Sequence, residues 1–169
     1  MSPAAALAPD APAARWTRAQ PWLSLVVRLA LAAVLIIAGA LKVADPQQAV
    51  RAVAAYELLP AAITPIVGFA LPWLEIALAA LLLCGFLTRG AAVATGVLMV
   101  VFIAGVASAW ARGLSIDCGC FGGGGQVAAG ETAYLSEILR DLGFIAMAAF
   151  LTIWPRSTLS LDARYADPA

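Results

Sequence analysis

The chain contains no histidine and few charged residues. Charged residues make up 12% of it and hydrophobic residues 63%, against about 25% and about 45–50% in ordinary soluble domains. This apolar excess is too large for a soluble core of 169 residues, and it indicates an integral membrane protein. The net charge is zero, which offers no footprint for nucleic acid and no basic patch for a membrane surface. The absence of histidine excludes histidine acid–base chemistry, haem ligation by histidine and most zinc sites.

Four long apolar stretches occupy residues 22–41, 66–87, 91–110 and 135–154. Each reaches the roughly 20 residues that a helix needs to cross the hydrocarbon layer of a bilayer. Tryptophans lie at the ends of these stretches, where aromatic rings prefer the level of the lipid headgroups: Trp22, Trp110 and Trp154. The sequence therefore predicts an all-α fold, an integral membrane four-helix bundle, over residues 22–155.

The segments outside the spans have their own patterns. Residues 1–21 are rich in alanine and proline and show no apolar run before a cleavage site, so we expect a disordered cytoplasmic tail. Between spans one and two, Asp45 can cap a helix that has Pro46 at its first position. An apolar stripe follows, which predicts a short amphipathic helix at the membrane interface. Residues 156–169 are expected to form a short cytoplasmic tail.

Basic residues predict the orientation. Five arginines lie on one side of the predicted bilayer and three basic residues on the other: Arg15, Arg18, Arg89, Arg156 and Arg164 against Lys42, Arg51 and Arg112. The side with more basic residues is expected to be cytoplasmic. This would make the chain a multi-pass protein of the cell membrane with both termini in the cytoplasm. The segment between spans three and four, and the amphipathic helix, would then be extracytoplasmic.

That segment carries Cys118 and Cys120, separated by one glycine and followed within two residues by four glycines. Two thiols this close can form a strained and readily reduced disulfide, which suits thiol–disulfide exchange. A stabilising disulfide is a weaker reading, because so short a loop removes little chain entropy. Two thiolates could also hold Cu(I), but no third soft ligand is nearby, and we expect no metal site. Two inert thiols are a further alternative.

The neighbours of the two cysteines lead to three expectations about reactivity. The glycines are expected to expose both sulfurs to a partner. Asp117 is expected to raise the pKa of the Cys118 thiol, and Arg112 to favour a thiolate. Cys120 would then be the better nucleophile.

Charged residues inside the spans should face other helices, because a charge in lipid is costly. Arg28 and Glu75 lie at levels that allow an ion pair between spans one and two. Glu75 and Arg140 are also candidate contacts for a quinone head group or a proton route. The structural and the functional reading both remain open. Cys84, in the second span, is expected to behave as a small hydrophobic residue.

Several motifs together resemble one family: Ala38–Lys42 with Asp45-Pro46, Tyr56–Pro60, Pro72–Glu75, Gly85–Arg89 and Cys118–Gly122. The chain resembles, over about residues 25–154, the MauE (methylamine utilisation) family within the DoxX-like superfamily of four-span membrane proteins. The resemblance implies a helical bundle similar to vitamin K epoxide reductase and DsbB-type enzymes. It also implies a role in the disulfide chemistry of exported proteins, together with a thioredoxin-like partner. Those enzymes use two cysteine pairs, whereas this chain has one outward pair, so the partner would supply the second.

We therefore expect a membrane thiol–disulfide oxidoreductase. Cys118 and Cys120 would exchange electrons with a thioredoxin-fold protein outside the cytoplasm, with a quinone as the candidate cofactor. The alternative is a non-catalytic assembly or scaffold subunit of a dehydrogenase or respiratory complex. Replacing both cysteines with serine separates the two, because a scaffold should survive the change.

Overall fold

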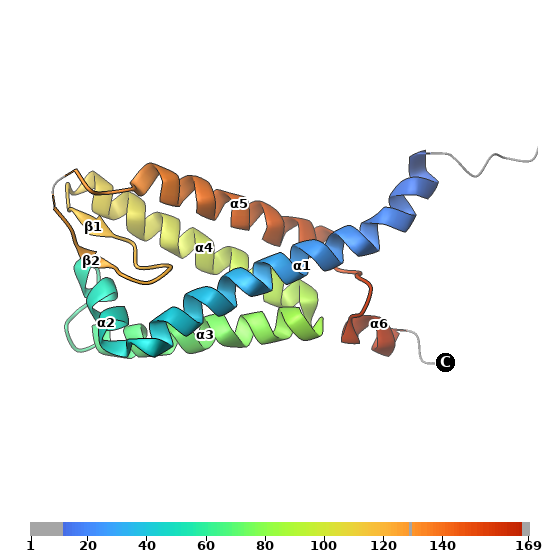
Figure 1. Cartoon of the computed structure of the whole chain (residues 1–169), viewed down its shortest axis with the longest axis horizontal. Helices are drawn as coiled ribbons and strands as arrows, with labels where there is room; N and C mark the ends of the chain where they lie inside the picture. The colour runs from blue at the N-terminus through green and yellow to red at the C-terminus, as the bar shows by residue number, and fades with distance from the viewer. Residues whose placement is uncertain (1–11, 129, 167–169) are drawn as a thin grey trace, which may run out of the picture.

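The computed structural model describes residues 12–128 and 130–166 (Figure 1). In this part of the chain, helices dominate and one short hairpin interrupts them. The elements are α1 (Pro12–Ala44), α2 (Pro46–Ala55), α3 (Thr64–Cys84), α4 (Thr88–Ala111), β1 (Ile116–Asp117), β2 (Gly125–Gln126), α5 (Tyr134–Ile153) and α6 (Leu161–Ala166).

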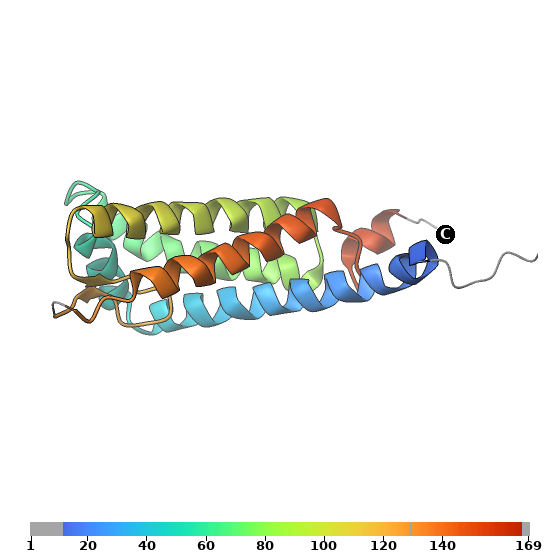
Figure 2. The same cartoon turned by 90° about the horizontal axis from the view of Figure 1, so that it is seen from above.

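The long helices α1, α3, α4 and α5 run along a common direction (Figures 1 and 2). Helix α1 packs against α3, and α4 packs against α5. Among the described residues, three helices are long and apolar enough to cross a membrane: Trp16–Ala44, Thr64–Cys84 and Thr88–Ala111. Helix α5 is 20 residues long but carries three charged residues in its first two turns, which lowers its hydropathy. The α3–α4 connection, residues 85–87, is short and forces the two helices into a hairpin.

The core lies where the four long helices meet, and it is built from leucine and small residues. Its leucines include Leu31, Leu35, Leu78, Leu82, Leu98 and Leu151. Gly39 lets α1 approach α3 closely, since a Cβ there would lie 2.7 Å from Ile76 Cγ1 and 3.0 Å from the Pro72 carbonyl oxygen. Small residues at such contacts are typical of helix packing in membranes.

Helix α2 confirms the capping prediction between the first two long helices. The Asp45 side chain accepts a hydrogen bond from the Gln48 backbone N–H at 2.9 Å, and Pro46 occupies the first turn. Gly68 of α3 admits α2, because a Cβ at Gly68 would lie 2.8 Å from Val50 Cα. The helix therefore lies against α3, at the end of the molecule that also holds the β-hairpin (Figure 1).

One expectation about the N-terminus is wrong within the described residues. Helix α1 begins at Pro12, so residues 12–21 are helical rather than disordered, whereas residues 1–11 lie outside the described part. The chain after α5 forms α6 and hydrogen-bonds to α1. Ser24 Oγ donates to the Trp154 carbonyl at 2.9 Å, and Arg28 Nη2 donates to the Leu159 carbonyl at 3.1 Å. Buried polar groups need hydrogen-bond partners, and the chain after α5 supplies one acceptor each for the Ser24 hydroxyl and the Arg28 guanidinium.

Candidate functional site

The β-hairpin folds the cysteine segment inward, at one end of the long helices. Strands β1 and β2 pair antiparallel, with Ile116 opposite Gln126 and Asp117 opposite Gly125. Gly119 and Gly124 both have positive φ, at +68° and +88°, a region that favours glycine. A Cβ at Gly124 would lie 2.6 Å from Gly119 Cα and 2.7 Å from the Cβ of Ala52 in α2. The glycines therefore let the segment fold back on itself and against α2.

The two cysteines are buried by this fold. Cys118 is 8% exposed and Cys120 is 7% exposed, and both are free thiols. The backbone N–H of Cys120 donates to Cys118 Sγ at 3.3 Å. The expectation that the glycine run exposes both sulfurs is wrong, because the run packs the loop down instead of opening it.

Helix α5 supplies the cation next to the thiols. Arg140 Nη2 lies 3.6 Å from Cys118 Sγ. The guanidinium is held on two other sides, by Asp141 Oδ1 at 3.0 Å from Nε and by the Phe121 ring, whose centroid lies 4.9 Å from Cζ. The expected cation, Arg112, donates instead to the carbonyl oxygens of Tyr56 and Ser108. Sequence reasoning assigned Arg140 to a quinone, whereas the structure places it on a cysteine sulfur.

The two thiols have different acidities because one donates a hydrogen bond to the other. Donation from the Cys120 side chain lowers the pKa of Cys118, against the opposing effect of burial, and Arg140 lowers it further. The same hydrogen bond raises the pKa of Cys120, and burial and the nearby charges of Cys118 and Asp141 add to that shift. Cys118 is therefore the thiol that ionises first. This reverses the expectation that Cys120 is the better nucleophile, which rested on Asp117 alone.

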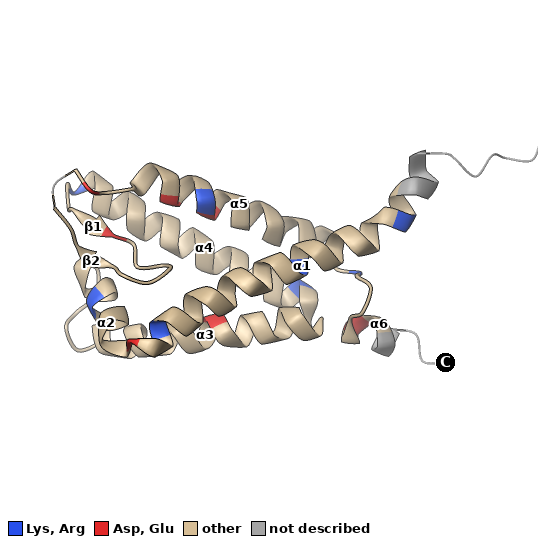
Figure 3. Ribbon diagram, in the orientation of Figure 1, with Lys and Arg blue, Asp and Glu red and all other residues tan. Residues whose placement is uncertain are grey.

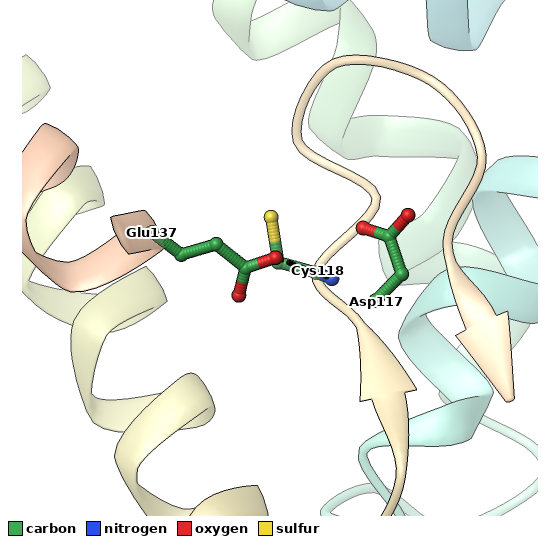
Figure 4. Close-up of side chains that lie close together, drawn as sticks. All are labelled: Asp117, Cys118 and Glu137. Carbon is green, nitrogen blue, oxygen red and sulfur yellow. Dashed lines mark hydrogen bonds between the residues drawn. The ribbon is translucent and has the colours of Figure 1, made fainter. Parts of the chain in front are cut away.

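Two carboxylates flank Cys118 (Figure 4). Glu137 of α5 and Asp117 of β1 lie on either side of it, and one ligand atom from each of the three residues falls within 4.8 Å of the others. Glu137 Oε1 accepts from the Cys118 backbone N–H at 3.4 Å. One soft sulfur with two hard oxygens matches neither a thiolate site for Cu(I) nor an all-oxygen site for Mg²⁺ or Ca²⁺. We therefore interpret the cluster as two carboxylates that lie on either side of a thiol, and not as a metal site.

A buried ion pair lies beside the cysteine loop. Lys42 Nζ lies 2.7 Å from Glu75 Oε1 and 2.9 Å from Oε2, and it also donates to the Cys120 carbonyl at 2.9 Å. Lys42 is 7% exposed and Glu75 is 1% exposed. The expected Arg28–Glu75 pair does not form, because Arg28 instead hydrogen-bonds to the segment after α5.

The pairing of Lys42 with Glu75 was not predicted from the sequence, because Lys42 follows the first apolar stretch and was expected to lie outside the membrane. A signal was available in Gly39, which lies three residues earlier on the same helix face. A Cβ on Gly39 would lie 3.4 Å from Glu75 Cβ, so the close approach of α1 to α3 brings Lys42 within reach of the carboxylate. Among the described residues, Lys42 thus links α1, α3 and the cysteine loop.

An apolar cavity of about 240 Å³ reaches the cysteines. Residues from α2, α3 and α4 line it, together with the chain from Cys118 to Cys120; its walls include Tyr56, Leu71 and Phe102. Glu75 and Arg140, the candidate quinone contacts, do not line it. Glu75 instead borders a void of about 10 Å³, too small for a quinone ring. Of the two, only the larger cavity has room for a ring-sized ligand beside the cysteines.

The third cysteine stands apart from this site. Cys84 is the last residue of α3, at the end of the helix next to α4, and it is exposed. Its expected behaviour as a small hydrophobic residue stays a prediction.

Replacing Glu75 tests the ion pair. Glu75→Leu should lower the unfolding temperature in detergent sharply, because loss of one partner leaves a buried ammonium and costs about 3–5 kcal/mol. Glu75→Gln should be milder, since the amide oxygen can still accept from Lys42. The double variant Lys42→Met/Glu75→Leu should recover much of the loss by removing both charges. A double variant no more stable than Glu75→Leu would contradict the pairing.

Comparison with known proteins assigns the chain to a protein family. The model of the family described as methylamine utilisation protein MauE matches residues 20–154, most of the chain. No curated protein and no solved structure matches. The match and the three apolar helices agree, and the resemblance to MauE seen in the sequence is confirmed. The chain is a multi-pass membrane protein that belongs to the MauE family.

Proposed function

We propose that this protein is a membrane thiol–disulfide oxidoreductase whose reactive pair is Cys118 and Cys120. The observation that carries the proposal is the environment of Cys118 Sγ. It accepts hydrogen bonds from the Cys120 N–H and from Arg140. Donors of this kind favour a thiolate, which is the reactive form in exchange. A scaffold subunit would have no use for a thiol stabilised in this way.

The exchange balances with the atoms present. The Cys118 thiolate attacks one sulfur of a partner disulfide, an S–S bond forms between the two proteins, and one partner thiolate leaves. Cys120 then loses its proton and attacks Cys118 Sγ, which releases the second partner thiolate. The partner disulfide is reduced by two electrons, and Cys118 and Cys120 are oxidised to a disulfide. The reverse sequence oxidises a partner dithiol, so the same site serves either direction.

In this proposal Asp141 takes the proton of Cys120. Asp141 Oδ2 is buried and has no hydrogen-bond partner among the described residues. Asp141 borders the same 10 Å³ void as Cys120, and such a void is about the size that one water requires. A water in this void would carry the proton from the Cys120 thiol to Asp141.

The partner in this proposal is an extracytoplasmic thioredoxin-fold protein. The start of α1 and helix α6 lie at one end of the molecule, and the cysteine hairpin lies at the other (Figure 1). With α5 as a fourth span and the arginine-rich end in the cytoplasm, the hairpin faces outward. Figure 3 shows charged residues at both ends of the molecule and a few within α3 and α5, where they face other parts of the protein.

A partner protein reaches the sulfurs only if the glycine loop moves. Gln48 of α2 holds that loop, because its side-chain amide donates to the carbonyls of Gly123 and Gly124, the first at 2.8 Å. The Tyr56 hydroxyl also donates to the Cys118 carbonyl at 3.2 Å. Breaking the Gln48 contacts would free the tip of the loop while Lys42 still holds Cys120.

A quinone is the candidate cofactor for regenerating the pair. When bound, a quinone would accept two electrons. Tyr56, Leu71 and Phe102 would hold its ring in the apolar cavity beside the cysteines. Val101, 58% exposed on α4, also lines this cavity, so the cavity opens toward lipid.

A single-cysteine trap tests which thiol attacks. In a Cys84→Ser background, Cys120→Ser keeps Cys118 and should accumulate a mixed disulfide with glutathione disulfide, because no resolving thiol remains. Cys118→Ser should form that adduct at least several-fold more slowly, since the pKa of Cys120 is raised. Intact-mass spectrometry measures both. Faster trapping by Cys120 would reverse the assignment, and no trapping by either variant would contradict thiol exchange.

Arg140 should control the pH profile of Cys118. The hydrogen bond from Arg140 helps to lower the pKa of Cys118, so Arg140→Met should raise that pKa and move the alkylation profile to higher pH. At neutral pH the alkylation rate of the reduced protein should fall several-fold. Arg112→Met removes the same charge away from the sulfurs and should leave the profile in place. Equal profiles for wild type and Arg140→Met would contradict this role.

A further inference from the structure

We propose that the end of the molecule opposite the cysteines carries a binding site for a phosphate group, such as that of an anionic phospholipid. The site is a cleft of about 690 Å³. The first turn of α4 forms one wall, the chain from Pro155 to Ala163 forms the other, and Pro21 of α1 closes it. The proposal does not depend on the thiol chemistry.

The charge of the cleft suits an anion. Arg89 and Arg156 line it, and neither has an ion-pair partner among the described residues. Asp162 also lines it, but both of its oxygens are occupied, since they accept from the backbone N–H groups of Leu87 and Thr88 at 2.9 Å. That carboxylate caps α4, and two guanidinium groups remain for a ligand. Arginine presents planar pairs of donors that match phosphate oxygens.

Unpartnered hydroxyl groups are the second, independent observation. Thr88 Oγ1, Ser157 Oγ and Thr158 Oγ1 are buried and have no hydrogen-bond partner in the described part of the chain. All three residues line the cleft, and Thr88 and Ser157 are 0% and 4% exposed. A buried hydroxyl without a partner destabilises the fold, so three together indicate a missing acceptor or donor. Phosphate oxygens supply such acceptors after a rotation of these short side chains.

A further cation lies behind the cleft. Arg28 is 1% exposed, and its Nε and Nη1 atoms also lack partners in the described chain. It lies against Ser160, because a Cβ on Gly85 would approach both Arg28 Nη1 and Ser160 Cβ. No carboxylate of the described residues forms an ion pair with Arg28, although Asp162 of the cleft acts on it electrostatically. Together with Arg89 and Arg156, it leaves the cleft with an excess of positive charge.

The position of the cleft favours a lipid as the source of the phosphate. Trp154 lies at the end of α5, next to the cleft wall, and packs edge-on against Trp16 with centroids 5.6 Å apart. Tryptophans of this kind mark the headgroup level of a bilayer. Pro21, Leu87 and Pro155 give the cleft apolar walls, which suit a glycerol backbone better than a fully hydrated anion. Basic sites at this level are common places for anionic headgroups.

Lipid titration of the purified full chain in detergent tests the proposal. Phosphatidylglycerol should raise the unfolding temperature, and phosphatidylcholine should raise it much less. Arg89→Gln/Arg156→Gln should weaken the apparent affinity for phosphatidylglycerol at least tenfold, with Arg89→Gln alone as the fallback if the double variant does not fold. The matched control, Arg51→Gln/Arg112→Gln, removes the same charge at the other end and should respond as wild type does.

The remaining arms separate the sources of phosphate. Glycerol 3-phosphate and inorganic phosphate, at millimolar concentration, should have little effect if the lipid is the ligand. An equal effect that Arg89→Gln/Arg156→Gln abolishes would keep the phosphate site but assign it to a soluble ester. A phosphatidylglycerol effect that survives in Arg89→Gln/Arg156→Gln, or that falls equally in the matched control, would overturn the proposal. Either result would mean that phosphatidylglycerol acts through general charge attraction and not through this cleft.

Discussion

The Lys42–Glu75 ion pair is the interaction on which the cysteine end of this protein depends. The Lys42 ammonium group donates hydrogen bonds to the Glu75 carboxylate of α3 and to the Cys120 carbonyl at the same time. Two charges so deeply buried are expensive, and they are tolerated only when each hydrogen-bonding position is filled. The requirement fixes α1 against α3 at Gly39 and fixes the cysteine loop against both. The position of Cys120, and through it the hydrogen bond to Cys118, follows from this arrangement.

The charges of α5 complete the site at a cost to that helix. Glu137, Arg140 and Asp141 lie in its first eight residues, and they make it less apolar than α3 or α4. Arg140 reaches a sulfur, and Asp141 keeps the guanidinium in place. Charged residues inside a membrane helix are retained when a function uses them. In the proposed exchange Arg140 stabilises the Cys118 thiolate, and Asp141 receives the proton of Cys120.

The sequence predicted the positions of the helices well and the contacts between side chains poorly. Apolar length located the long helices within a few residues, apart from the earlier start of α1, and the Asp45 cap was right because capping is a local interaction. The Arg28–Glu75 pair was wrong because height along a helix does not say which face a side chain occupies. A run of glycines was taken as an open loop, although positive φ also allows a chain to fold inward. The predicted order of acidity of Cys118 and Cys120 was wrong. The hydrogen bond from Cys120 and the contact with Arg140, which lower the pKa of Cys118, depend on tertiary structure.

The most direct test is a redox titration of the purified protein in glutathione buffers, read by mass spectrometry after alkylation. The account predicts one reversible two-electron transition in which Cys118 and Cys120 lose their alkylatable thiols together, while Cys84 remains alkylatable. It also predicts that Cys118→Ser/Cys120→Ser has no function in cells. If both thiols stay reduced under oxidising buffers while that double variant keeps full function, thiol exchange is wrong, and a scaffold role should replace it.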